Sequence, residues 1–334
     1  MAIHNPSQEW LDQVQEPTLD PDRAIVDPHH HLWNRGGWTY ELKQLWRDTG
    51  SGHNITQTIF IECGANYFDE GPKHLKPVGE TSYVVGFAEK SQAGQGSKIS
   101  GIVAHADLTD PHLDEILDAH VETGKGYFRG IRHSIARAQH PESMSIAGKY
   151  QEGLSKSEDF CQGLRRLSER GFTYDCWLYH YQILEFRDMA LAAPDTTMVF
   201  NHFGTPIGVG PYADNREEIF EQWKEDVAAV AECANVVAKL GGLAMPDNGF
   251  GWDLRDTPGT SDELLEAQAR YYHHAIHCFG ADRCMFESNF PVDRLSISYH
   301  TLWNALKKIA VDYSEEDKTA MFSGTATRIY KLID

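Results

Sequence analysis

The strongest constraint on the fold of this chain is a series of eight short apolar segments separated by stretches with helical patterning. Such segments are typical of buried β-strands. The predicted strands are residues 25–31, 55–63, 99–106, 126–133, 173–179, 197–202, 236–240 and 283–287, with a weaker pattern at 83–88. Strands that alternate with helices predict the α/β class, and eight of them favour a (β/α)8 TIM barrel. An open doubly wound sheet is the main alternative, but no Gly-x-Gly-x-x-Gly turn follows any strand.

Signals for helix starts and ends fall between these segments. Starts are predicted at Ser157, Asn215, Ser261 and Ser314, ends at Gly171 and Gly280, and a last helix over 325–332.

The domain organisation is expected to be simple. Residues 1–24 are polar and rich in Pro and Asp, which predicts a surface arm before a single barrel domain over residues 25–334. Long loops rich in Gly, Pro and aromatic residues are predicted after strands six and seven, at 205–215 and 245–260. In a barrel such loops lie at the C-terminal ends of the strands, where active sites form.

Composition excludes several classes of partner. Lys and Arg number 30 against 49 Asp and Glu, and the formal charge of −19 repels nucleic acid and anionic lipid. No apolar run is long enough for a membrane span, and the N-terminus lacks a signal-peptide pattern. The 6 cysteines form no Cys-x-x-Cys pair, which is typical of reduced thiols. We therefore expect a cytoplasmic protein with a small-molecule partner, and a homo-oligomer remains open.

The richest motif lies at the end of the first predicted strand, in Asp-Pro-His-His-His-Leu-Trp at residues 27–33. Residues two apart on a strand point to the same face, so His29 and His31 should enter one cavity together. Two imidazoles placed in this way can bind a metal ion or polarise a carbonyl group. Three ordinary histidines at a turn are the less favoured interpretation.

Other ionisable and polar side chains fall at the ends of later strands, as a barrel active site requires. They are Glu62, Arg129, Arg132, His133, His180, Asn201, His202, Lys239, Glu287, Ser288, Asn289 and Asp293. Lys239 is expected to pair with a carboxylate, with Schiff-base formation as the less favoured role. His105 and His133 are expected to be structural.

Four motifs occur in a recognisable order: residues 27–33, Phe-Arg-Gly-Ile-Arg at 128–132, Asn-His-Phe-Gly at 201–204, and Phe-Glu-Ser-Asn-Phe-Pro at 286–291. Together they resemble the amidohydrolase superfamily, in its amidohydrolase-2 group. The similarity covers about residues 25–332. It points to the branch with pyrone-dicarboxylate lactonase, sulfomuconolactone hydrolase and sugar-acid lactonases. The motifs are specific to the superfamily and not to one substrate.

The resemblance implies roles for individual residues. His29, His31, His202 and His180 match positions that bind a divalent metal, with zinc as the first candidate; in metal-free members the imidazoles polarise the carbonyl instead. Arg129 and Arg132 resemble arginines that hold a substrate carboxylate, a task that suits the guanidinium fork. The two are three apart, so a regular strand cannot point both inward. Trp177 is expected at the wall of the substrate pocket.

One position departs from the superfamily pattern. Asn289 stands where the superfamily has an Asp that acts as general base, and an amide cannot accept a proton at neutral pH. Asp293 is a candidate replacement, although a loop-closing or surface charge explains it equally well. Glu287, His202 and Glu62 are further candidates for the base.

The predicted function is a hydrolase that opens a lactone, or a related cyclic ester, of a carboxylated small molecule. His29, His31 and His202 would act with Asp293 and Asn289 in catalysis, while Arg129, Arg132, His180 and Trp177 would contact the substrate. A metal-dependent decarboxylase of an aromatic or muconate-like acid is the second hypothesis. A non-catalytic small-molecule binder, motivated by Asn289, is the third.

Overall fold

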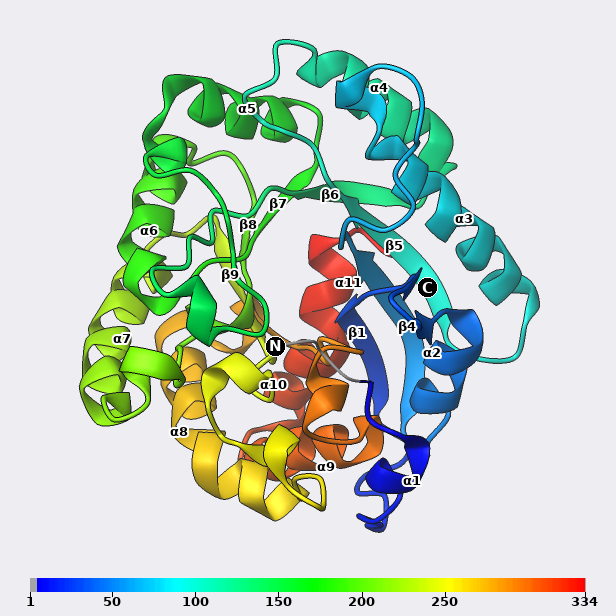
Figure 1. Cartoon of the computed structure of the whole chain (residues 1–334), viewed down its shortest axis with the longest axis vertical. Coiled ribbons are helices and arrows are strands. Elements are labelled where there is room, and N and C mark those ends of the chain that lie inside the picture. The colour runs from blue at the N-terminus through cyan, green and yellow to red at the C-terminus, as the bar shows by residue number, and fades with distance from the viewer. Residues whose placement is uncertain (1–4, 334) are drawn as a thin grey trace.

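The architecture is a ring of eight parallel strands with helices around it, which confirms the predicted (β/α)8 barrel (Figure 1). This computed structural model describes residues 5–333. Neighbouring strands pair in chain order. They are β1 (Ala24–His30), β4 (Asn54–Ile61), β5 (Lys98–Ala104), β6 (Phe128–Arg132), β7 (Thr173–Cys176), β8 (Met198–Phe200), β9 (Val236–Leu240) and β10 (Cys284–Phe286). A short hairpin, β2 (Trp33–Arg35) and β3 (Trp38–Tyr40), follows β1.

The ring is closed where β1 meets the segment after β10. His31 N donates to the carbonyl of Phe290 at 2.7 Å, and Asn289 N donates to the carbonyl of His29 at 2.9 Å. Asp27 is fully buried and accepts hydrogen bonds from Ser288 N and Oγ, at 3.0 and 2.6 Å. Burial raises the pKa of Asp27 to about 6. Asp27, the first residue of the histidine motif, therefore stabilises the closure of the barrel and does not line the pocket.

Helices cover the outside of the ring, as Figure 1 shows. The longer ones are α3 (Val78–Ala93), α4 (Leu113–Gly124), α5 (Glu158–Glu169), α6 (Ile183–Ala192), α7 (Arg216–Ala231), α8 (Ser261–Phe279) and α9 (Tyr299–Ile309). The shorter ones are α1 (Gln8–Leu11), α2 (Leu42–Thr49), α10 (Glu315–Thr319) and α11 (Thr325–Ile329). No helix in the described range is both long and apolar enough to cross a membrane.

Most predicted helix signals agree with the structure. The hydroxyls of Ser157 and Ser314 accept hydrogen bonds from the first turns of α5 and α10. Thr260, one residue before the predicted start, caps α8 through a reciprocal pair with Glu263. Asn215 precedes α7 without a side-chain cap bond.

Two predicted elements differ from the structure. The weak strand at 83–88 is wrong, because these residues lie in α3. Val84, Val85 and Ala88 in that segment are buried. At positions i, i+1 and i+4 they share one side of a helix, which a short apolar run cannot distinguish from a strand. The last helix is also shorter than predicted and ends at Ile329.

At the N-terminal ends of the strands, the C-terminal segment of the chain fills the barrel interior. Val26, Ile59, Val103, Val199 and Met285 point inward and pack in one buried cluster. Ala326, Tyr330 and Leu332 from the C-terminal segment belong to the same cluster, and Figure 1 shows α11 within the ring. The strands present their opposite, C-terminal ends to the pocket described next.

The N-terminal residues from 5 to 23 lie along α8 and α9. Trp10 Nε1 donates to the carbonyl of Arg255 at 3.1 Å, and the Glu16 carboxylate accepts hydrogen bonds from Ser261 N and Asn304 Nδ2, at 2.9 and 3.1 Å. All 6 cysteines are free thiols.

Candidate active site

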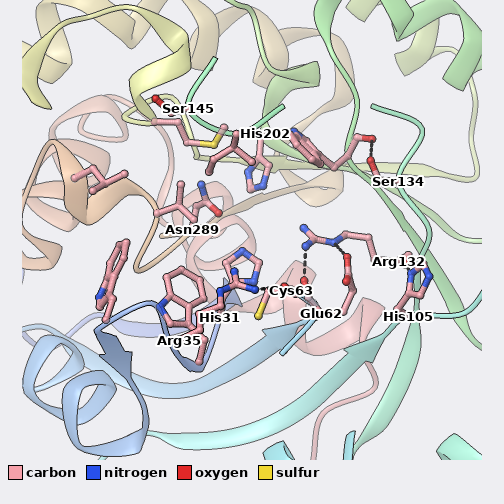
Figure 2. A pocket seen from close by; sticks show the side chains of 18 of the residues that line it. His31, Arg35, Glu62, Cys63, His105, Arg132, Ser134, Ser145, His202 and Asn289 are labelled. Carbon is pink, nitrogen blue, oxygen red and sulfur yellow. Dashed lines mark hydrogen bonds and ion pairs between the residues drawn. The ribbon is translucent and has the colours of Figure 1, made fainter. Parts of the chain in front are cut away.

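A pocket of about 620 Å³ opens at the C-terminal ends of the strands (Figure 2). Residues from all eight barrel strands, or from the loops that follow them, line it. Ionisable and polar lining residues are His31, Arg35, Glu62, His105, Arg132, Ser134, Ser145, His202 and Asn289. Apolar and aromatic lining residues include Trp33, Trp38, Cys63, Tyr67, Ile146, Tyr150, Trp177, Met245, Val292 and Leu295. The pocket is thus a largely apolar hollow with a polar floor.

Imidazoles from opposite sides of the ring meet beneath this pocket. The His29 and His202 ring centroids are 4.4 Å apart, and those of His29 and His31 are 5.0 Å apart. Glu287, directly after β10, joins two of them: its Oε1 accepts from His202 Nδ1 at 2.7 Å, and its Oε2 lies 2.8 Å from His29 Nδ1. All four residues are buried. The first, sixth and eighth barrel strands therefore converge at one carboxylate.

The His29–Glu287 contact is unusual for a buried pair. Although His29 Nδ1 and Glu287 Oε2 are only 2.8 Å apart, their approach lacks hydrogen-bond geometry, and neither atom has a hydrogen-bond partner among residues 5–333. Unpartnered buried polar atoms are rare and need an explanation. One ligand atom from each of His29, His202 and Glu287 lies within 4.8 Å of the other two. Two imidazoles and a carboxylate so arranged fit a divalent cation such as Zn²⁺.

The protonation states favour metal binding at this spot. Burial lowers the pKa of His29 well below its ordinary value, and the neighbouring His202 and Lys239 lower it further. Burial likewise lowers the pKa of His31. Neutral imidazoles are the form that binds metal ions. His31 Nδ1 donates to the carbonyl of Ile61 at 2.8 Å, so its Nε2 is the ring nitrogen left for the pocket.

The glycines after β9 make room for this cluster. A Cβ on Gly242, where φ is +77°, would lie 2.4 Å from His202 Nδ1. A Cβ on Gly241 would lie 2.3 Å from the carbonyl oxygen of Glu287. His202 and Asn289 themselves have φ of 54°, a conformation that costs a non-glycine residue about 1–3 kcal/mol. Backbone strain is thus present at two of the three strand ends that supply the site.

Arg132 and Glu62 form an ion pair on the pocket wall, drawn with dashed lines in Figure 2. Arg132 Nε donates to Glu62 Oε1 at 2.7 Å, and a second nitrogen of the guanidinium lies 3.5 Å from His29 Nε2. Burial acts to raise the pKa of Glu62, but the Arg132 charge and the nearby His105 lower it overall. The wall therefore holds an ionised carboxylate and a guanidinium beside the imidazoles.

Asn289 lines the pocket, but Asp293 does not. Asn289 Nδ2 donates to Asp293 Oδ1 at 2.8 Å, and Ala244 N donates to Asp293 Oδ2 at 3.1 Å. Burial raises the pKa of Asp293 well above its ordinary value. The predicted role of Asp293 as general base is not supported by this geometry, because its carboxylate lies behind Asn289. Its contacts make it a residue that orients the Asn289 amide.

Arg129 is not brought to the pocket, in contrast to the prediction. It lies near the start of β6, and its guanidinium donates to the carbonyls of Phe128 and Ser100, at 3.1 and 3.2 Å. Arg132 is the last residue of the same strand and reaches the pocket. Position along the strand separates the two, since the pocket lies at the C-terminal ends only.

His180 is likewise not among the residues that could bind a metal ion, His29, His202 and Glu287. Its Nδ1 accepts from Ile207 N at 3.3 Å, its ring packs against Tyr181 and Tyr212, and burial lowers its pKa to about 4. It lies in a helical turn after β7, beyond the end of the strand, so its side chain meets the neighbouring loop.

Trp177, from the same strand end as His180, does line the pocket, and its Nε1 donates to Thr205 Oγ1 at 3.1 Å. Lys239 forms the expected ion pair, with Asp175 Oδ2 at 2.7 Å.

Several lining residues were missed or misjudged from the sequence. His105 was expected to be structural only, yet it lies in the pocket wall with its Nδ1 bonded to the Arg132 carbonyl at 3.0 Å. The segment between β6 and α5, residues 133–157, supplies Ser145 and Ile146. The long interval without helical patterning was the signal that could have identified this third long loop.

Asp247, in the loop after β9, holds that segment over the pocket. Its carboxylate accepts hydrogen bonds from Ser145 N at 2.6 Å and from Ile146 N at 2.9 Å. Tyr179 adds two contacts, since its hydroxyl accepts from Gly148 N and donates to the Ile146 carbonyl. Loops from three different strands are therefore joined above the site.

Comparisons with known proteins agree with this architecture. The family model described as "Amidohydrolase" matches residues 26–332. An uncharacterized protein, y4mH of Sinorhizobium fredii, is 32% identical over 93% of this chain and 99% of its own length. L-fucono-1,5-lactonase of Burkholderia multivorans is 23% identical over 92% of this chain and 96% of its own length. An amidohydrolase of Burkholderia multivorans solved with bound zinc superposes with a TM-score of 0.72 at 20% identity, covering 93% of this chain and all of the other.

Proposed function

The chain belongs to the amidohydrolase family, and from this membership we propose that it is a hydrolase that opens a lactone of a carboxylated small molecule. The observation that carries the proposal is the convergence of His29, His202 and Glu287 beneath a pocket that Arg132 also enters. The likeness to a sugar lactonase supports a cyclic ester as the substrate class.

His29, His202 and Glu287 are the residues that would hold a divalent cation, with zinc as the first candidate because a protein of the same fold was solved with zinc. When bound, such an ion supplies Lewis-acid polarisation of a carbonyl and lowers the pKa of water toward ~7. The expected ligands His31 and His180 are not in this set. Glu287 takes their place.

The remaining pocket groups suit ester hydrolysis. The Arg132 guanidinium can donate hydrogen bonds to the carbonyl oxygen as negative charge develops on it. Glu62, kept ionised by Arg132, can take the proton of the attacking water and return it to the ring oxygen when the C–O bond breaks. The Asn289 amide, oriented by Asp293, can accept a hydrogen bond from that water. In this proposal the base lies directly after the second barrel strand and takes the place of the superfamily Asp.

The test combines elemental analysis with a panel of lactones. We expect about one divalent ion per chain and hydrolysis of at least one carboxylated lactone. His202→Ala and Glu287→Gln should lower both the metal content and kcat/KM, the latter by about 10²–10⁴-fold. Glu62→Gln should lower kcat/KM with the metal content unchanged. His277→Ala, a histidine on the exposed side of α8, is the matched control.

Three results would contradict the proposal. Hydrolysis that is unaffected in His202→Ala and Glu287→Gln would remove the assigned site. Release of carbon dioxide from aromatic or muconate-like acids, without lactone hydrolysis, would identify a decarboxylase. Ligand binding with no turnover, and none gained in Asn289→Asp, would identify a binding protein.

A further inference from the structure

Positively charged side chains outnumber negatively charged ones among the residues that line the pocket. Glu62 is the single carboxylate among the lining residues, whereas two guanidiniums, Arg132 and Arg35, face the same space. Arg132 is neutralised by its 2.7 Å ion pair with Glu62. Arg35 has no carboxylate within ion-pair distance anywhere in residues 5–333. In a protein with a formal charge of −19, the pocket therefore holds one guanidinium, that of Arg35, which no carboxylate of the described residues pairs with.

Arg35 is held in place without using up its hydrogen-bonding capacity. It is the last residue of β2, and its guanidinium lies 4.9 Å from the centre of the Trp33 ring. One nitrogen donates to the carbonyl of Cys63 at 2.9 Å. Stacking and one hydrogen bond orient the guanidinium plane, and most of its five N–H donors stay free. A fork of this kind matches a carboxylate in two parallel hydrogen bonds.

The surface next to Arg35 is apolar. Trp33 and Trp38 pack edge to face, with ring centroids 5.0 Å apart, and form a buried cluster with Met245, Val292 and Leu295. All five of these residues line the pocket. A polyhydroxylated ring would leave its hydroxyl groups without partners against such a wall, whereas an aromatic or aliphatic ring would bury apolar area.

We propose that Arg35 binds the carboxylate of the substrate, and that the substrate is a lactone with an apolar ring system rather than a sugar lactone. The inference rests on the proposed lactone hydrolysis for its reacting group, and on Arg35 and the tryptophan wall for its substrate class. Arg35 thus takes the role that the sequence suggested for Arg129. The ester carbonyl would lie toward Arg132 and the imidazoles, and the acid group toward the β2–β3 hairpin.

The experiment uses a matched pair of probes, 3,4-dihydrocoumarin-6-carboxylate and its methyl ester. For Arg35→Gln we expect KM for the carboxylate to rise by about 10- to 100-fold with kcat little changed. KM for the neutral ester should stay within about threefold of the wild-type value. Arg35→Lys, which keeps the charge but loses the fork, should recover part of the difference. Arg187→Gln, an equal charge change on α6, is the control.

A binding measurement separates this inference from the proposed function. Chroman-6-carboxylate has the same ring system without a carbonyl group, so its binding by calorimetry needs no catalysis. If the wild-type protein hydrolyses neither lactone probe and Arg35→Gln loses binding of chroman-6-carboxylate, the role of Arg35 would be supported and the proposed lactone hydrolysis overturned. Unchanged binding and unchanged KM in Arg35→Gln would overturn the role of Arg35 alone. A wild-type protein that neither binds chroman-6-carboxylate nor hydrolyses the carboxylate probe would overturn both.

Discussion

At the scale of single residues, the site depends on small side chains as much as on charged ones. His202 has a left-handed backbone conformation two residues after β8, and its ring lies against the backbone of Gly242. The Glu287 carboxylate then fixes the ring through Nδ1. The imidazole is positioned from three elements, so a change in any of them should disturb the chemistry more than the fold.

Gly242→Ala tests this dependence. The added Cβ would come within 2.4 Å of His202 Nδ1, and φ of +77° is strained for alanine. We expect kcat/KM for lactone hydrolysis to fall about 10²-fold, because a displacement near 1 Å of a catalytic group has that effect. Gly126→Ala is the control, since φ there is +87° but nothing lies within 4 Å of the added Cβ. Equal losses of activity in the two variants would contradict the prediction.

At the scale of elements, the walls of the pocket are loops, some of which are joined by hydrogen bonds. The segment at 133–157 depends on Asp247 and Tyr179 for its position, because both accept hydrogen bonds from its backbone amides. The hairpin β2–β3 brings Arg35 and two tryptophans to the opposite wall. These loops lie outside the barrel strands and carry the groups that would select the substrate.

Asp247→Ala should release the loop over the pocket. Two half-buried amides, Ser145 N and Ile146 N, would lose their acceptor, at a cost of about 1 kcal/mol each. We expect faster hydrogen exchange at both amides and a rise in KM of several-fold, with a smaller effect on kcat. Asp214→Ala, an exposed change in the loop after β8, is the control. Unchanged exchange rates at residues 145 and 146 would contradict the role of Asp247 in holding this segment.

At the scale of the whole molecule, buried ionisable groups tie the outer helices to the barrel. His120 on α4 is an example: its Nδ1 lies 2.9 Å from Thr81 Oγ1 on α3, and its Nε2 lies 3.0 Å from the carbonyl of His105. Burial lowers the pKa of His120 to about 4. The folded protein therefore keeps this imidazole neutral at a pH where the unfolded chain binds a proton.

The stability of the protein should reflect this difference. Because the folded pKa lies below the unfolded value of 6.5, the contribution of His120 is present above pH 6.5 and is lost as the pH falls toward 4. Urea unfolding at several pH values should show that the free energy of unfolding falls less steeply over this range in His120→Gln than in the wild type. His277→Gln on the exposed side of α8 should retain the wild-type slope. A wild-type slope in His120→Gln would contradict the assignment.

Much of the fold followed from the sequence because strands buried on both faces appear as continuous apolar runs. All eight barrel strands were predicted in this way, and their ends pointed to His29, His202, Arg132 and Trp177, which the structure brings to or beneath one pocket. The one false strand, at 83–88, came from a helix segment too short to show its periodicity.

The alternation of eight strands with helices, and the imidazoles at the ends of two of those strands, can be read from the sequence alone, because burial and backbone alternation act locally. Which charged groups meet at the pocket depends on how the chain folds as a whole. Arg129 and His180 are turned to other contacts, Asp293 lies behind Asn289, and Glu287 and Arg35 enter the site. The reason is physical: direction and depth of a side chain depend on barrel closure and on loops from distant parts of the chain, which no local pattern records.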